Sequence, residues 1–241
     1  MTRELVYGRN AARELYRGPR QVLETWVTER AATQIPWLDS GPRPQVKPER
    51  LLSEAAGTRD HQGVVAWCEP FRYADAYELA RRDAPLLVCL DQVSDPHNLG
   101  AVARSVEGAG ATAVVLPAHG SARVTPAVCR ASAGAVEHVP IAVVPNLARY
   151  LADIKGNDLW AYAADSDGAI PMWDTDFSGG VALVLGAEGK GVRPLVRRTC
   201  DATVAIPLAG NVGSLNVSVA AAVLLYEARR QRTSRPASDN L

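Results

Sequence analysis

The chain has 241 residues, which suffices for one large domain or two smaller ones with a substantial buried core. A hydrophobic content of 47% and a charged content of 22% are those of an ordinary globular protein. Basic and acidic residues number 26 each, which excludes a global charge that would attract a nucleic acid, so any such binding needs local patches.

The cysteines are widely separated and form no C-x-x-C pair: Cys68, Cys89, Cys129 and Cys200. This spacing argues against a zinc site and against a disulfide framework, and it fits reduced thiols. The first residues lack an apolar signal core, and no apolar run approaches transmembrane length. We therefore expect a cytoplasmic protein.

The composition changes near residue 80. The first 70 residues hold short elements interrupted by Pro and Gly, and residues 69–85 form a polar connector with a predicted helix at 73–82. Apolar strand-like runs then alternate with helical spacing, which predicts a parallel sheet covered on both faces. The predicted strands are 86–90, 112–117, 136–144, 159–165, 181–186 and 202–207, and the predicted helices are 98–110, 125–134, 145–158 and a C-terminal helix within 210–232.

Ligands of such sheets bind beyond the carboxyl ends of the strands, so the loops after strands are of interest. The first of these loops, "LDQVSDPHNLGAVARS" (90–105), carries Asn98 and, further into the next helix, Arg104. One interpretation is a helix capped by Asn98 with Arg104 solvated; another places the guanidinium at the loop opening, where it suits a phosphate. A metal site formed by Asp91, Asp95 and His97 is a weaker hypothesis, because their spacing matches no known ligand pattern.

The second loop is "VLGAEGKGVRPL" (184–195). Its glycines follow the order G-x-x-G-x-G, which matches neither the Walker pattern nor the dinucleotide fingerprint. Glu188 lies inside the loop and would repel a pyrophosphate, although it can accept hydrogen bonds from hydroxyls or amides. Glycines also let the backbone approach a flat ligand closely. The loop therefore fits a nucleotide or nucleoside pocket and excludes a triphosphate pocket.

The third loop, "IPLAGNVGSLN" (206–216), leads into the C-terminal helix. It contains no G-x-S-x-G elbow, which argues against a serine hydrolase. Ser214 is a reasonable N-cap, but Asn216 and Ser218 in the first turns gain nothing from helix propensity. Three unusual loops after strands of one sheet predict a composite pocket.

Taken together, "DPHNLGAVARS", "LVLGAEGKGV" and "IPLAGNVGSLNVSVAAAVLLYE" closely resemble three successive motifs of SpoU-type RNA 2′-O-ribose methyltransferases, a branch of the SPOUT superfamily. Their order and spacing match over roughly residues 86–232. In addition, "YGRNAARELYRG" (7–18) and "DHQGVVAW" (60–67) resemble the start and end of a small ribosomal-protein-like domain often fused before this catalytic domain. The combination is most similar to bacterial enzymes that methylate a guanosine ribose in 23S ribosomal RNA.

The resemblance implies an α/β fold with a C-terminal trefoil-knot methyltransferase domain and a smaller N-terminal α/β RNA-binding domain. The implied boundaries are 1–70 for the substrate-binding domain, 71–84 for a linker and 85–241 for the methyltransferase domain. It also implies a homodimer that needs no metal and binds S-adenosylmethionine (SAM). The residues implied at the cofactor are Gly186, Ile206, Leu208 and Leu215.

The resemblance implies a catalytic set of Arg104, Asn98, Glu188, Ser214 and Asn216. Arg104 matches the family's proposed base, but arginine normally stays protonated, so we expect it to position and polarise the ribose-phosphate. For Glu188 we favour a role in organising the loop over a role as a catalytic carboxylate, because methyl transfer to a hydroxyl needs no second acid.

Several alternatives stay open at this point. The same chemistry on tRNA or on another ribosomal nucleotide would use the same motifs, and a non-catalytic RNA-binding or assembly protein would not need the polar set. In the N-terminal part, the arginines at 3, 9, 13, 17 and 20 form either an RNA-facing patch or an ordinary solvated face. Trp26, Trp37 and Trp67 could stack on bases, but we expect them to pack in a core.

Overall fold

The computed structural model describes residues 2–156 and 158–234, and the chain divides into two compact units. One unit comprises Met1–Arg72 together with Arg123–His138, and the other comprises Tyr73–Ala122 together with Val139–Leu241. The segment 123–138 thus belongs to the N-terminal unit, although the residues on either side of it belong to the second. No helix in the described part of the chain has the length and apolar character needed to cross a membrane.

The N-terminal unit contains a four-stranded sheet in the order β1–β4–β2–β3, antiparallel except between β2 and β3. Because side chains alternate along a strand, β4 contributes Val64 to the core on one face and Val65 and Trp67 to the core on the other. The strands are β1 (Glu4–Tyr7), β2 (Val22–Val27), β3 (Gln45–Val46) and β4 (Val64–Cys68). The helices are α1 (Arg9–Arg17), α2 (Glu29–Gln34), η1 (Pro36–Ser40), α3 (Glu49–Ala56), α6 (Pro126–Ala131) and η2 (Ala135–Glu137).

Several N-terminal arginines have partners within this unit. Arg20 is buried and donates to the carboxylate of Glu137, which is also buried, so Arg20 is not part of an RNA-facing patch. Arg3 pairs with Glu24 at 2.9 Å. The three tryptophans pack against the two cores, which confirms the expectation of core packing.

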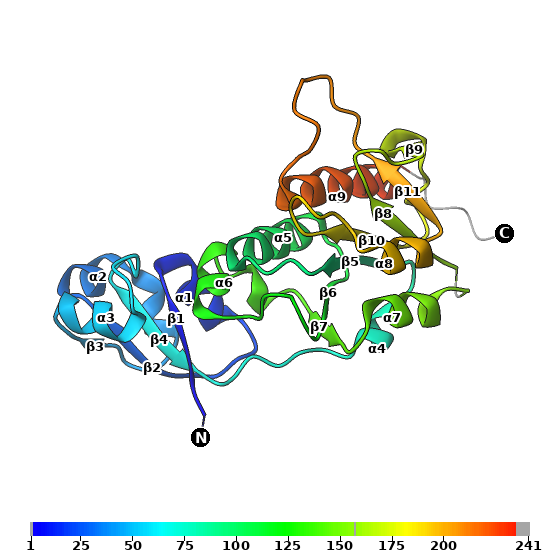
Figure 1. The fold of residues 1–241 in the computed structure, drawn as a ribbon. Coiled ribbons are helices and arrows are strands. Elements are labelled where there is room, and N and C mark those ends of the chain that lie inside the picture. Colours follow the sequence, from blue (N-terminus) through cyan, green and yellow to red (C-terminus); the bar gives the residue numbers. More distant parts are fainter. Residues whose placement is uncertain (1, 157, 235–241) are drawn as a thin grey trace. The chain divides into compact units, whose positions relative to one another are not determined.

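The second unit is built on a seven-stranded parallel sheet in the order β7–β6–β5–β10–β8–β11–β9 (Figure 1). The central strand β10 therefore lies between β5 and β8, although both precede it by many residues. This arrangement confirms the predicted parallel α/β class with a smaller N-terminal part. The strands are β5 (Leu86–Asp91), β6 (Ala113–Pro117), β7 (Ile141–Val144), β8 (Leu159–Ala164), β9 (Ile170–Pro171), β10 (Gly180–Gly186) and β11 (Ala202–Ala205).

Helices cover both faces of this sheet. Ala182 and Val184 of β10 face a core shared with α4, α7 and α8, while α5 and α9 pack against each other on the opposite side (Figure 1). Because both faces of the sheet are buried, its strands are continuous apolar runs and do not alternate apolar with polar residues. The helices are α4 (Ala76–Ala80), α5 (Pro96–Ala109), α7 (Leu147–Ile154), η3 (Met172–Asp174), α8 (Pro194–Thr199) and α9 (Val217–Ser234).

Some predicted boundaries were wrong. The run at 136–144 is a strand only from Ile141, because Ala135–Glu137 forms a 3-10 turn. Ser214 is not a helix cap, since α9 begins at Val217. Asn216 caps it instead, with its carbonyl accepting from the Ala220 amide and its side-chain oxygen accepting from the Ser218 amide at 2.8 Å.

Candidate active site

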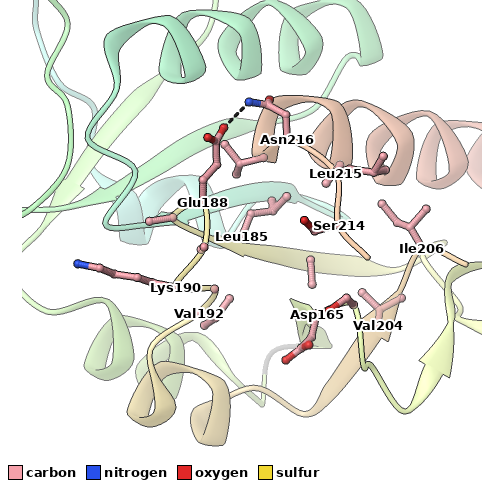
Figure 2. Close-up of a pocket in the computed structure, with 18 of the residues that line it drawn as sticks. Asp165, Leu185, Glu188, Lys190, Val192, Val204, Ile206, Ser214, Leu215 and Asn216 are labelled. Atoms are coloured by element: carbon pink, nitrogen blue, oxygen red, sulfur yellow. Dashed lines mark hydrogen bonds between the residues drawn. The ribbon is translucent and has the colours of Figure 1, made fainter. Parts of the chain in front are cut away.

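A pocket of about 660 Å³ opens at the carboxyl ends of β8, β10 and β11 (Figure 2). Its size lies within the range of cofactor and small-ligand pockets. Apolar side chains form much of its wall, with Glu188 and Asn216 on one side of the pocket and Asp165 on the opposite side (Figure 2). The apolar lining includes Leu185, Val192, Val204, Ile206, Leu208, Leu215 and Val217. The polar and charged lining includes Asp165, Ser166, Glu188, Lys190, Arg197, Ser214 and Asn216.

The glycine loop that follows β10 is folded tightly on itself. The amide of Gly191 donates to the carbonyl of Ala187 at 2.9 Å, and Gly189 and Gly191 have positive φ angles of 74° and 63°. A Cβ on Gly186 would lie 1.9 Å from the carbonyl carbon of Gly191. The loop therefore requires glycine at 186 for close backbone approach, and not for a phosphate cradle.

A buried ion pair holds the end of this loop against β5. The carboxylate of Asp91 is fully buried and accepts from the backbone amide of Arg193 at 2.9 Å. The Arg193 guanidinium adds a contact of 2.7 Å to the same carboxylate. Asp91 is thus committed to Arg193, while Asp95 caps α5 by accepting from the His97 amide at 2.8 Å. No group of three or more metal-ligating side chains occurs among the described residues.

The three sequence motifs meet in one hydrogen-bond network. The side-chain amide of Asn98 donates to Glu188 at 3.0 Å, and that of Asn216 donates to Asn98 at 3.1 Å. The Asn216 amide also donates to Glu188, as Figure 2 shows. Since Asp95 caps α5, Asn98 has its side chain free for this network and is not the cap. Residues from α5, the glycine loop and the start of α9 are therefore tied together.

The other predicted site residues are placed in two ways. Gly186, Ile206, Leu208 and Leu215 all line the pocket, as does Ser214. Arg104 does not line it; its side chain is exposed on α5 and makes no hydrogen bond or ion pair to any residue that the structure describes. Its guanidinium is therefore available to a ligand outside the pocket.

Three charged residues near the pocket were missed by the sequence analysis. Arg193 belongs to the loop but was not singled out, and Asp165 and Arg197 lie in segments that were read only as a strand end and an unassigned stretch. Asp165 could have been identified as a candidate, because it is a carboxylate at the end of a predicted strand. Arg197 gave no signal, because α8 was not predicted.

None of the cysteines is suited to act as a nucleophile. All four are free thiols, and burial raises the pKa of Cys68 to about 11 and the pKa of Cys129 to about 12. Burial raises the pKa of Cys89 and Cys200 as well. Since the thiolate is the reactive form, these groups are inert at neutral pH.

Comparison with known proteins identifies the family. The model of the SpoU rRNA methylase family matches residues 85–226, and a model described as RNA 2′-O ribose methyltransferase substrate binding matches residues 5–74. The chain belongs to the SpoU rRNA methylase family. As a member, it is a SAM-dependent RNA 2′-O-methyltransferase.

Relatives of this SpoU protein match along nearly its whole length. The 23S rRNA (guanosine-2′-O-)-methyltransferase RlmB of Pseudomonas syringae pv. tomato is 40% identical, with 96% of this chain and 97% of the relative covered. The RlmB of Vibrio cholerae is 38% identical, with 96% and 98% covered. The crystal structure of the SpoU methyltransferase AviRb from Streptomyces viridochromogenes, in complex with AdoMet, matches with a TM-score of 0.83 at 27% identity, covering 97% of this chain and 92% of that one.

The pocket of this SpoU protein suits SAM. Its apolar wall, which includes Val204 and Ile206, can receive a base, and its polar ends can receive the hydroxyls and the amino-acid part. Glu188 at the glycine loop would repel a di- or triphosphate, but a sulfonium cofactor carries no phosphate. When bound, SAM supplies an electrophilic methyl group, and the residues around the pocket hold and orient it.

Proposed function

We propose that this protein methylates the ribose 2′-hydroxyl of a guanosine in 23S ribosomal RNA. The single observation that carries this proposal is the full-length similarity to RlmB enzymes, which includes both the substrate-binding and the methylase segments. In the reaction the 2′-oxygen would bond to the methyl carbon of SAM, the sulfur–methyl bond would break to release S-adenosylhomocysteine, and the hydroxyl proton would pass to the solvent.

Arg104 is proposed to position and polarise the ribose-phosphate. A guanidinium stays protonated and offers several donors in a planar fork that suits phosphate oxygens. Its exposure on α5 and its lack of partners among the described side chains support a role toward RNA. A positioned donor lowers the barrier by fixing the geometry of attack and by stabilising the developing charge on oxygen.

Asn98, Glu188 and Asn216 are proposed to organise the catalytic loops. Glu188 accepts from both asparagines, so its carboxylate is engaged in holding α5 and α9 to the glycine loop. We propose that Ser214 lies against the reacting groups, and that Gly186, Ile206, Leu208 and Leu215 hold the cofactor; their place in the pocket lining supports this.

The domain roles follow the same proposal. We propose residues 1–70 as the RNA substrate-binding domain, 71–84 as the linker and 85–241 as the methyltransferase domain with a C-terminal trefoil knot. We further propose a homodimer that acts in the cytoplasm without a metal. A ribosomal substrate and four free thiols support the cytoplasm as the site of action. Sedimentation equilibrium of the full chain tests the dimer.

The proposed function is tested by mapping methylated riboses. Total RNA from a strain lacking the gene should lose one 2′-O-methyl guanosine of 23S rRNA, and wild-type protein should restore it. Arg104→Ala should fail to restore it while unfolding at the wild-type temperature, and Arg123→Ala, a change of the same kind outside the three motifs, should restore it. Loss of a tRNA methylation instead would show that the substrate is tRNA and not 23S rRNA. Near wild-type activity of Arg104→Ala would refute the role proposed for Arg104.

A further inference from the structure

The pocket has a second charged end that the three motifs do not include. Asp165 follows the last residue of β8, and Figure 2 shows it on the opposite side of the pocket from Glu188 and Asn216. Arg197 of α8 lines the same end and pairs with the Asp165 carboxylate at 3.1 Å. The network of Glu188 and Asn216 thus organises one end, and an aspartate–arginine pair forms the other.

The position of Asp165 is fixed by its backbone and by its neighbours. Its amide donates to the Val204 carbonyl at 3.0 Å, and its carbonyl accepts from the Gly168 amide at 3.1 Å. A Cβ on Gly168 would lie 2.5 Å from the carbonyl carbon of Val204, so the turn is closed tightly onto β11. The Asp167 amide donates to one Asp165 carboxylate oxygen at 3.0 Å, while Arg197 pairs with the other. The carboxylate is therefore oriented before a ligand arrives.

This carboxylate retains capacity to accept hydrogen bonds. Each carboxylate oxygen can accept two bonds, and each Asp165 oxygen has one partner among the described residues. The side chain is 25% exposed and lines the pocket, so a ligand can reach it. An ionised carboxylate only accepts, so its ligand must donate, as hydroxyl or amino groups do. The positive charge of Arg197 beside it disfavours an ammonium group and leaves neutral hydroxyls as the better match.

The strand order indicates which hydroxyls these are. β8 is the immediate neighbour of β10, whose carboxyl end begins the glycine loop. In open parallel sheets that bind dinucleotides, an acidic residue at the end of the strand beside the glycine-loop strand accepts from the ribose hydroxyls. Unlike that residue, Asp165 precedes the glycine loop in the chain, but it too lies at the carboxyl end of the strand beside the glycine-loop strand, next to the apolar wall of Val204 and Ile206 that suits a base.

We propose that Asp165, held by Arg197, accepts hydrogen bonds from the ribose hydroxyls of the cofactor's adenosine and thereby selects for an intact ribose. This inference rests on the proposed use of SAM. It makes Asp165 a cofactor-binding residue of the end of the pocket away from methyl transfer, and it makes Arg197 a positioning residue that acts through Asp165.

Titration calorimetry with three ligands tests the proposal on the full chain. The ligands are S-adenosylhomocysteine, 5′-methylthioadenosine, which lacks the amino-acid part, and the 2′,3′-dideoxy form of 5′-methylthioadenosine. Asp165→Asn replaces charge-assisted hydrogen bonds by neutral ones and should weaken binding of the first two ligands by the same factor, about tenfold. It should leave binding of the dideoxy ligand unchanged. Asp167→Asn, a matched change in the same turn but outside the pocket lining, should alter none of the three.

Each other result overturns the proposal in a recognisable way. A loss confined to S-adenosylhomocysteine would assign Asp165 to the amino-acid part, and an equal loss for the dideoxy ligand would make its role structural. Unchanged binding of all three ligands would remove Asp165 from the site. If wild-type protein binds neither S-adenosylhomocysteine nor methylthioadenosine, then the proposed use of SAM fails, and this inference fails with it.

Discussion

Replacement of Arg193 by alanine should destabilise the second unit strongly, because it leaves a buried carboxylate without its counter-charge. Asp91 is fully buried at the end of β5, whereas the Arg193 side chain is 44% exposed. In the wild type the carboxylate receives the Arg193 guanidinium and the Arg193 amide. Arg193→Ala keeps the amide and removes the guanidinium, so one hydrogen bond from the described residues would remain for this carboxylate.

The size of the effect follows from the burial of the two partners. Removing one partner of a buried ion pair costs about 3–5 kcal/mol. The exposed side of Arg193 lets water approach after truncation, and the remaining amide bond still satisfies part of the carboxylate, so we expect the lower end, about 3 kcal/mol. For a unit of this size, about 1 kcal/mol lowers the unfolding temperature by about 2–4 °C, and the total decrease should be about 6–12 °C.

Urea and thermal unfolding followed by circular dichroism measure this loss. Arg198→Ala is the matched control, because Arg198 is exposed on α8 and has no hydrogen bond or ion pair to the described residues. The double variant Asp91→Asn/Arg193→Ala should be more stable than Arg193→Ala alone, since the unpaired charge is gone. A loss below about 1 kcal/mol for Arg193→Ala, or no recovery in the double variant, would refute the reasoning.

Two further predictions concern the polar network and a buried histidine. Glu188→Gln keeps an acceptor and should retain the rate of methyl transfer within about tenfold. Glu188→Ala removes the contacts that hold the loops together and should lower that rate by about a hundredfold. An equal decrease for both variants would show that catalysis needs the negative charge of Glu188. Burial lowers the pKa of His61 below its usual value of about 6.5, only partly opposed by Glu49 and Asp60, and its Nδ1 accepts from the Gly63 amide at 3.0 Å. The unfolded chain therefore binds the proton more readily, so the stability of the N-terminal unit should be full above about pH 6.5 and fall below it. His61→Gln should flatten that slope in urea unfolding at pH 5.5 and 7.5, and an unchanged slope would contradict the assignment.

The sheet of the second unit was predictable because its strands are buried on both faces. Runs such as 86–90 and 181–186 are continuously apolar, and their alternation with helical spacing indicates a parallel sheet. The pocket edge was predictable for the same reason, since loops after parallel strands share one edge. The glycine order around Glu188 also excluded a phosphate cradle, and the tight turn in the structure agrees with that exclusion.

Other features depend on contacts between segments far apart in the sequence. The helix α8 is only six residues long, and its apolar side chain Val196 reaches the core because Arg193 fixes the start of the helix to Asp91. The role proposed for Asp165 depends on β8 lying beside β10, a neighbour relation that hydrophobic periodicity does not contain. The segment 123–138 packs with the N-terminal unit through partners such as Arg20, more than one hundred residues away.

The start of α9 explains why the polar residues there were hard to interpret from sequence. Asn216 uses its side-chain oxygen to cap the helix and its side-chain amide to hold Asn98 and Glu188. The Ser218 hydroxyl donates to the same Asn216 oxygen at 2.6 Å, which fixes the orientation of the amide. The same side chain therefore caps the helix with its oxygen and assembles the site with its amide group, and neither function excludes the other. A change at Asn216 must alter helix stability and loop geometry together, whereas a change at Glu188, which caps no helix in the described part of the chain, alters the loop geometry alone.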